Sequence, residues 1–164
     1  MNGHITPYWD IHDYIKLQYN KATIDEIYLK EYLASGHSND QINIYNLFEN
    51  QSMPQSALKI KENFTELNPI SVAVNYLKPG TYLPRHCDLY KKWLKVFNLD
   101  NVQRIQRIIV MLQDNVPGQY LEIDNTIINN WNAGDWFSWT GKTSHAVYNF
   151  SNADRYALQI TGYK

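Results

Sequence analysis

Residues 105–160 read IQRIIVMLQDNVPGQYLEIDNTIINNWNAGDWFSWTGKTSHAVYNFSNADRYALQI, and this stretch decides the fold. Apolar and β-branched runs alternate along it with turn residues. Residues 105–112 form a nearly continuous apolar run, which is typical of a buried strand. Five shorter runs follow at close intervals, and each is predicted to be a strand: residues 120–123, 127–128, 135–139, 146–150 and 156–160. Many short strands with regular turns predict a sandwich, a jelly roll or a barrel.

The strand pattern begins before this stretch. Residues 71–76 alternate between polar and apolar side chains, and a Pro-Gly pair at 79–80 predicts a turn. Residues 91–97 interrupt the pattern with a short amphipathic insertion, which we predict to be helical. We therefore expect residues 70–164 to form a mainly β core.

The first part of the chain is predicted to be mainly helical. Thr23 followed by Glu26 is a capping-box pattern that predicts the start of one helix. A second helix is predicted over residues 52–69, and a strand over residues 41–47. We expect a single domain over residues 1–164, in which residues 1–69 are a support region whose helices pack on the outside of the β core.

The composition narrows the class of protein. About 44% of the 164 residues are hydrophobic, so the chain can bury a core, and the 14% of aromatic residues favour β structure. The net charge of -1 and the absence of a basic run argue against a nucleic-acid partner. With one cysteine, no signal-peptide pattern and no apolar stretch of membrane-spanning length, we expect a cytoplasmic protein without a membrane partner.

Three residues have the spacing of a metal site. His86 and Asp88 are two positions apart, so on a strand they would point to the same face, and His145 would complete a set of two imidazoles and one carboxylate. This set occupies one face of an octahedral ion and leaves three positions open, which is typical of non-haem Fe(II). Arg155 follows His145 by ten residues, so the next strand could present its guanidinium to the same pocket. A guanidinium matches a carboxylate with two parallel hydrogen bonds.

Residues 71–162 resemble the Fe(II)- and 2-oxoglutarate-dependent dioxygenase superfamily. Residues 76–88, YLKPGTYLPRHCD, are similar to the prolyl-hydroxylase pattern of Tyr, Pro-Gly and an aromatic residue before His-x-Asp. Residues 131–139, WNAGDWFSW, with 145–149, HAVYN, and Arg155, are closer to the aspartyl/asparaginyl β-hydroxylase branch. The resemblance implies a double-stranded β-helix, a jelly roll of the kind that cupins also have.

The resemblance also implies roles for individual residues. His86, Asp88 and His145 would bind the iron, and Arg155 would hold the distal carboxylate of 2-oxoglutarate. Tyr82 would hydrogen-bond the same carboxylate.

A second arginine is implied near the cofactor or the substrate. Arg107 opens the strand at residues 108–112, where several relatives place an arginine, and Arg104 competes with it for that role. The sequence departs from the aspartyl hydroxylase pattern at one position. The best-known aspartyl hydroxylases lack the metal carboxylate that Asp88 supplies here, so the substrate does not follow from that branch.

The activity implied is hydroxylation of a C–H bond with O₂ and 2-oxoglutarate. The substrate would be a prolyl, asparaginyl or aspartyl residue of a peptide or protein, or a free amino acid. Two alternatives stay open: a cupin-like metalloenzyme that does not use 2-oxoglutarate, and a non-catalytic jelly-roll metal-binding protein. The insertion after Asp88 is expected to cover the substrate, with contacts from Lys91, Lys92 and Trp93.

Overall fold

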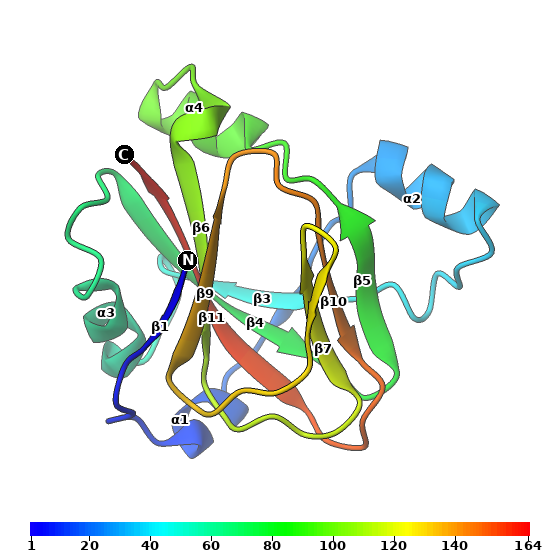
Figure 1. The fold of residues 1–164 in the computed structure, drawn as a ribbon, viewed down its shortest axis with the longest axis horizontal. Coiled ribbons are helices and arrows are strands. Elements are labelled where there is room, and N and C mark those ends of the chain that lie inside the picture. The colour runs from blue at the N-terminus through cyan, green and yellow to red at the C-terminus, as the bar shows by residue number, and fades with distance from the viewer.

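Two antiparallel sheets form the molecule, and the computed structural model describes all of residues 1–164 (Figure 1). The larger sheet has seven strands in the order β1-β9-β6-β11-β4-β3-β2, and the smaller has four in the order β5-β10-β7-β8. This is a mainly β, double-stranded β-helix fold, as the sequence predicted.

Each element occupies a short segment of the chain. The large sheet contains β1 (Asn2–His4), β2 (Asn20–Lys21), β3 (Tyr45–Phe48), β4 (Ile70–Leu77), β6 (Ile105–Met111), β9 (Asp135–Thr140) and β11 (Arg155–Tyr163). The small sheet contains β5 (Thr81–His86), β7 (Gln119–Ile123), β8 (Thr126–Ile128) and β10 (His145–Asn149). The helices are α1 (Ile11–Ile15), α2 (Glu26–Ala34), α3 (Gln55–Lys61) and α4 (Lys91–Phe97), and a 3-10 turn spans Val102–Arg104.

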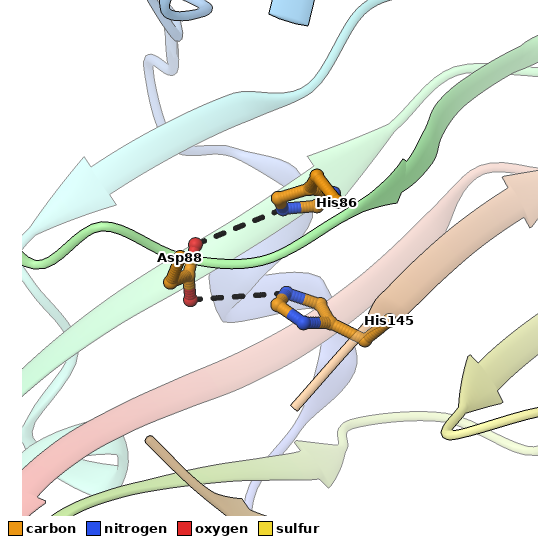
Figure 2. Close-up of side chains that lie close together, drawn as sticks. All are labelled: His86, Asp88 and His145. Carbon is orange, nitrogen blue, oxygen red and sulfur yellow. Dashed lines mark ion pairs between the residues drawn. The ribbon is translucent and has the colours of Figure 1, made fainter. Parts of the chain in front are cut away.

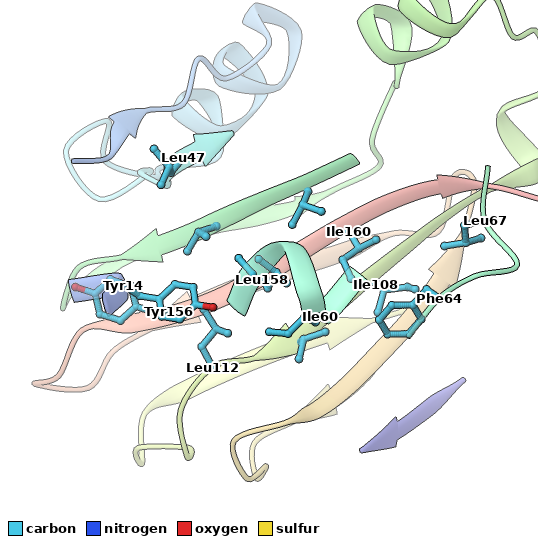
Figure 3. Close-up of a cluster of buried hydrophobic side chains, with 14 residues drawn as sticks. Tyr14, Leu47, Ile60, Phe64, Leu67, Ile108, Leu112, Tyr156, Leu158 and Ile160 are labelled. Carbon is cyan, nitrogen blue, oxygen red and sulfur yellow. The ribbon is translucent and has the colours of Figure 1, made fainter. Parts of the chain in front are cut away.

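The two faces of the large sheet have different environments. Successive residues of a strand point to opposite faces, so Ile108 of β6 joins a hydrophobic cluster with Ile60 of α3 (Figure 3). Its neighbour Ile109 instead packs toward the small sheet, beside Leu121 of β7. Fully burying one such side chain stabilises the fold by roughly 1.5–3 kcal/mol. The helical side of the sheet is thus the main core, and the opposite side faces the space between the two sheets.

The predicted strands after residue 70 are confirmed, and α4 occupies the predicted residues 91–97. The helix near residue 23 begins later than expected. Asp25, not Thr23, is the N-cap of α2, because its side chain accepts a hydrogen bond from the amide of Ile27.

The N-terminal region does more than support the β core. Its strand β1 pairs with β9 and its strand β3 pairs with β4, so residues 1–69 extend the large sheet as well as supplying helices. The predicted strand at 41–47 lies slightly further along, at Tyr45–Phe48, and the predicted helix at 52–69 is confined to Gln55–Lys61. None of the helices has the length and apolar character needed to cross a membrane.

Candidate metal centre and its cavity

His86, Asp88 and His145 converge at one end of the small sheet. His86 ends β5, His145 begins β10, and the two residues lie opposite each other in the antiparallel pair. The Nε2 atom of each histidine is 3.7 Å from a different carboxylate oxygen of Asp88 (Figure 2). All three ligand atoms lie within 4.8 Å of one another, so one ion between them can reach all three.

Backbone carbonyl groups fix the orientation of both imidazoles. The Nδ1 atom of His86 is 2.8 Å from the carbonyl oxygen of Pro84, and that of His145 is 3.0 Å from the carbonyl oxygen of Thr143. A nitrogen that faces a carbonyl oxygen carries the proton, so each ring keeps its Nε2 lone pair free toward Asp88. This is the tautomer that metal-binding histidines adopt when their other nitrogen is anchored.

The ionisation states of the site also suit a metal ion. Burial lowers the pKa of His145 to about 4, so its imidazole is neutral at pH 7. Burial alone would raise the pKa of Asp88, but the charge of Arg107 and the two histidines hold it well below its usual value. Neutral imidazole and ionised carboxylate are the forms that bind metals, so the three residues fit a divalent cation with open coordination positions.

Arg107 contacts the metal-site carboxylate directly. Its Nη2 and Nε atoms donate to Oδ2 of Asp88 at 2.5 and 3.1 Å, and its Nη1 donates to Oγ1 of Thr161 at 2.5 Å. The Arg107 side chain is buried at the site. Arg104 is exposed instead, with its guanidinium 4.6 Å from the ring centre of Tyr163. Of the two arginines considered, the structure therefore brings only Arg107 to the metal centre.

The three predicted ligands line a cavity of about 330 Å³ between the sheets. This volume is at the lower end of the range for small-molecule sites. The other side chains that face it are mostly apolar, among them Ile109, Leu121, Trp139, Val147 and Ala157. Arg155 lines the same cavity.

Arg155 is a buried cation without a counter-ion. Its side chain belongs to β11 and is 3% exposed. Its one hydrogen bond runs from Nη2 to Sδ of Met111 at 3.7 Å, Nε has no partner, and the guanidinium lies 5.4 Å from the ring centre of Trp131. Burial lowers the pKa of Arg155 to about 10, so the group is still charged at pH 7. An unpaired buried charge is costly, and an anionic ligand in the cavity would compensate it.

A family model connects this geometry to known proteins. The model described as aspartyl/asparaginyl beta-hydroxylase matches residues 27–164. The chain belongs to this family. The match includes all three metal-site residues and Arg155. A comparison with curated protein sequences gave no match.

The chain is also similar to solved structures at low sequence identity, and the first of those named here supports the fold. A prolyl-4-hydroxylase from Pseudomonas putida is similar at 12% identity with a TM-score of 0.58, over 94% of this chain and 96% of that one. A predicted oxalate decarboxylase from Thermotoga maritima has 15% identity and a TM-score of 0.47, over 74% and 82% of the two chains. A cupin protein from Bacteroides fragilis has 19% identity and a TM-score of 0.42, over 60% and 69%.

A β-bulge in β5 determines which side chains of this strand face the cavity. His145 lies opposite His86 but Val147 lies opposite Leu83, so two steps along β10 correspond to three along β5. Leu83 and His86 consequently line the same cavity although they are three positions apart. Strict alternation would have placed His86 on the same face as Tyr82.

Tyr82 therefore faces away from the metal centre. Its ring stacks on Tyr148 with 5.9 Å between centroids, and its hydroxyl oxygen is 3.2 Å from Nδ1 of His37. Neither Tyr82 nor Tyr148 lines the cavity. The cofactor contact predicted for Tyr82 has no support in this geometry, and the extra residue in β5 is the physical reason.

If the cavity binds the 2-oxoglutarate that the resemblance implies, replacement of Tyr82 by Phe is expected to leave that affinity unchanged within about twofold, because the lost hydroxyl group faces His37. Equilibrium titration of both proteins with 2-oxoglutarate measures this. A tenfold loss of affinity would mean that the hydroxyl group reaches the cavity after all.

Helix α2 contributes to the site in a way that the sequence did not reveal. The hydroxyl group of Tyr28 donates to the carbonyl oxygen of Cys87 at 2.7 Å, between the two metal-site residues of that segment. The Tyr28 ring also meets the His86 ring edge-on, with 6.0 Å between centroids. No local pattern links a helical tyrosine to a residue 59 positions away, so sequence reasoning had no signal for it.

Proposed function

We propose that the protein is an Fe(II)- and 2-oxoglutarate-dependent dioxygenase that hydroxylates a C–H bond of a protein residue or an amino acid. The observation that carries this proposal is the unpaired guanidinium of Arg155 in the same cavity as His86, Asp88 and His145. A metal site alone fits many activities. A metal site facing a buried, uncompensated cation fits a co-substrate with a metal-chelating end and an anionic end.

2-Oxoglutarate has these two ends. Arg155 would bind its distal carboxylate through two parallel hydrogen bonds, and the 2-oxo acid end would face the three metal ligands. The apolar walls between them, including Ile109 and Leu121, would exclude water from the reacting groups. When bound, Fe(II) and 2-oxoglutarate would supply the oxidation: one atom of O₂ would enter succinate as CO₂ leaves, and the other would enter the substrate as a hydroxyl group.

The remaining residues of the centre would act by orientation. Arg107 holds the carboxylate of Asp88, and the carbonyl groups of Pro84 and Thr143 hold the imidazoles. Such outer contacts typically change metal affinity or activity by about 10–100-fold when they are removed.

The two alternatives explain less of the site. Neither a cupin-like metalloenzyme without 2-oxoglutarate nor a non-catalytic metal-binding protein by itself accounts for the buried charge of Arg155. The membership in a hydroxylase family also supports the dioxygenase proposal.

Anaerobic titration of 2-oxoglutarate into the Fe(II)-loaded protein tests the proposal. We expect a weak visible metal-to-ligand charge-transfer band, because chelation brings the 2-oxo acid onto the iron. The band should be absent from His145→Ala, which lacks one ligand. It should persist in the matched variant His12→Ala, whose imidazole is exposed on α1. A folded, iron-loaded wild-type protein that gives no band would favour one of the two alternatives.

A further inference from the structure

A groove opens next to the metal cavity. It has a volume of about 720 Å³ and lies between α4 and the end of β3, with β4 and β11 contributing to its lining. Asp88, Arg107 and Gln159 line both the groove and the cavity, together with Asp25 and Phe48 at the opening. The groove therefore leads from the protein surface to a metal-site carboxylate, where a substrate must present its C–H bond.

The α4 wall of this groove is built into the fold. The indole Nε1 of Trp93 donates to Oγ of Ser71 on β4 at 2.9 Å, and the Trp93 ring packs on Phe97 with 4.8 Å between centroids. The helix lies at one end of the two sheets, on the chain between β5 and β6 (Figure 1). A wall tied to the sheet in this way can hold a partner without first being ordered.

Several large apolar side chains that line the groove are exposed to solvent. Val96 is 66% exposed and Phe48 is 51% exposed, on opposite walls, and Phe97 and Leu89 are 37% and 38% exposed. A group of exposed apolar side chains at a functional cavity marks a binding surface. A free amino acid at Asp88 would leave Val96 and most of this surface in water.

The groove also has free positive charge. Lys91 and Lys92 line it, are exposed and form no ion pair. They occupy the first turn of α4, where a helix favours acidic side chains. By contrast, Glu49 is paired with Lys61, and the carboxylate of Asp25 caps α2. An acidic partner would therefore find two unpaired lysines on this wall.

We propose that this groove binds a polypeptide segment of the substrate, with apolar side chains next to the hydroxylated residue and acidic side chains that meet Lys91 and Lys92. The inference rests on the proposed function and narrows its substrate from any amino acid to a residue within an acidic peptide. The groove volume, more than twice the 330 Å³ of the cavity, suits several residues of an extended chain. The target residue would enter the cavity past Asp88 while its neighbours remain in the groove.

Two fluorescein-labelled peptides of equal length provide the test. Both carry the same central Leu-Pro-Asn-Phe segment, flanked by Glu residues in one and by Lys residues in the other. Their affinities are measured anaerobically by fluorescence anisotropy with the Fe(II)- and 2-oxoglutarate-loaded protein. We expect the acidic peptide to bind about tenfold more tightly, since each exposed charge pair contributes modestly.

The double variant K91E/K92E should reverse this preference. Because the first turn of a helix favours acidic residues, the variant is expected to fold at least as well as the wild type. The matched variant K95E changes the same charge on the same helix outside the groove and should keep the wild-type preference. Val96→Ser should weaken both peptides about fivefold by removing an apolar contact.

Any of three results would overturn the inference. The first is equal affinity of the two peptides for the wild type, and the second is an unchanged preference in K91E/K92E. The third is hydroxylation of free proline, asparagine or aspartate while neither peptide binds. The charge-transfer band, recorded on the same samples, separates failure of the groove proposal from failure of the proposed function. A band without peptide selectivity refutes peptide binding in the groove alone, whereas a missing band refutes the use of 2-oxoglutarate.

Discussion

Replacement of Arg155 by Met is expected to weaken 2-oxoglutarate binding strongly and to stabilise the protein. The guanidinium is buried, has no carboxylate partner and leaves Nε without an acceptor. A methionine has a similar length without the charge. Substitution of buried charged groups by apolar residues of similar volume is often stabilising, and about 2 kcal/mol is expected here. For a domain of this size the unfolding midpoint should rise by about 4–8 °C.

The same substitution should weaken 2-oxoglutarate binding by about 30-fold or more. Removal of one partner of a buried, hydrogen-bonded charge pair costs roughly 2–5 kcal/mol, which corresponds to this range of affinity. Thermal unfolding without ligand and anaerobic titration with 2-oxoglutarate measure the two effects. Iron binding should be retained, because Arg155 is not among the metal-site residues.

Arg104→Met is the matched control. The Arg104 guanidinium is exposed over Tyr163, so its removal should change neither property appreciably. If Arg155→Met instead destabilised the protein and bound 2-oxoglutarate normally, Arg155 would be a structural residue. A gain of stability together with a loss of affinity is what an unpaired cation kept for an anionic ligand produces.

The residues that line the metal cavity were predictable from the sequence where spacing along the chain places them together. His86 and Asp88 are close along the chain, and alternation on β11 turns Arg155 inward with Ala157 and Gln159. The strands themselves were recognisable because their apolar runs are separated by turn residues. The type of fold that joins these strands followed from the resemblance, and their order in the two sheets was not predicted, since period-two patterns carry no information about partners.

Features that depend on long-range packing were not predictable. The orientation of Tyr82 depends on one extra residue in β5, which is visible only once β10 is paired with it. The contact of Tyr28 with the segment at Cys87 depends on where α2 docks. Likewise, the choice between Arg104 and Arg107 required the position of Asp88.

Replacement of Asp88 by Asn is expected to remove metal binding and to destabilise the metal-free protein. Asn has nearly the same shape but no charge, so the buried guanidinium of Arg107 would lose its counter-ion. Breaking a buried pair in this way costs about 3–5 kcal/mol. The Asp88 side chain is 23% exposed, so solvent screening lowers the expectation to about 2–3 kcal/mol. Urea unfolding in the presence of a chelator measures it, and iron content measures the metal loss.

His145→Ala separates the two roles of the centre. This variant should lose the metal to the same extent as Asp88→Asn, but it leaves the Asp88–Arg107 pair intact. The free energy of unfolding of the metal-free protein should therefore fall by only about 1 kcal/mol. The double variant Asp88→Asn/Arg107→Met removes both charges, and its destabilisation should be about 2 kcal/mol smaller than the sum of the two single changes. Simple additivity would show that Arg107 does not depend on Asp88. A coupling of the expected size, together with the loss of iron from Asp88→Asn, would show that one carboxylate serves both as a metal ligand and as the counter-ion of a buried arginine.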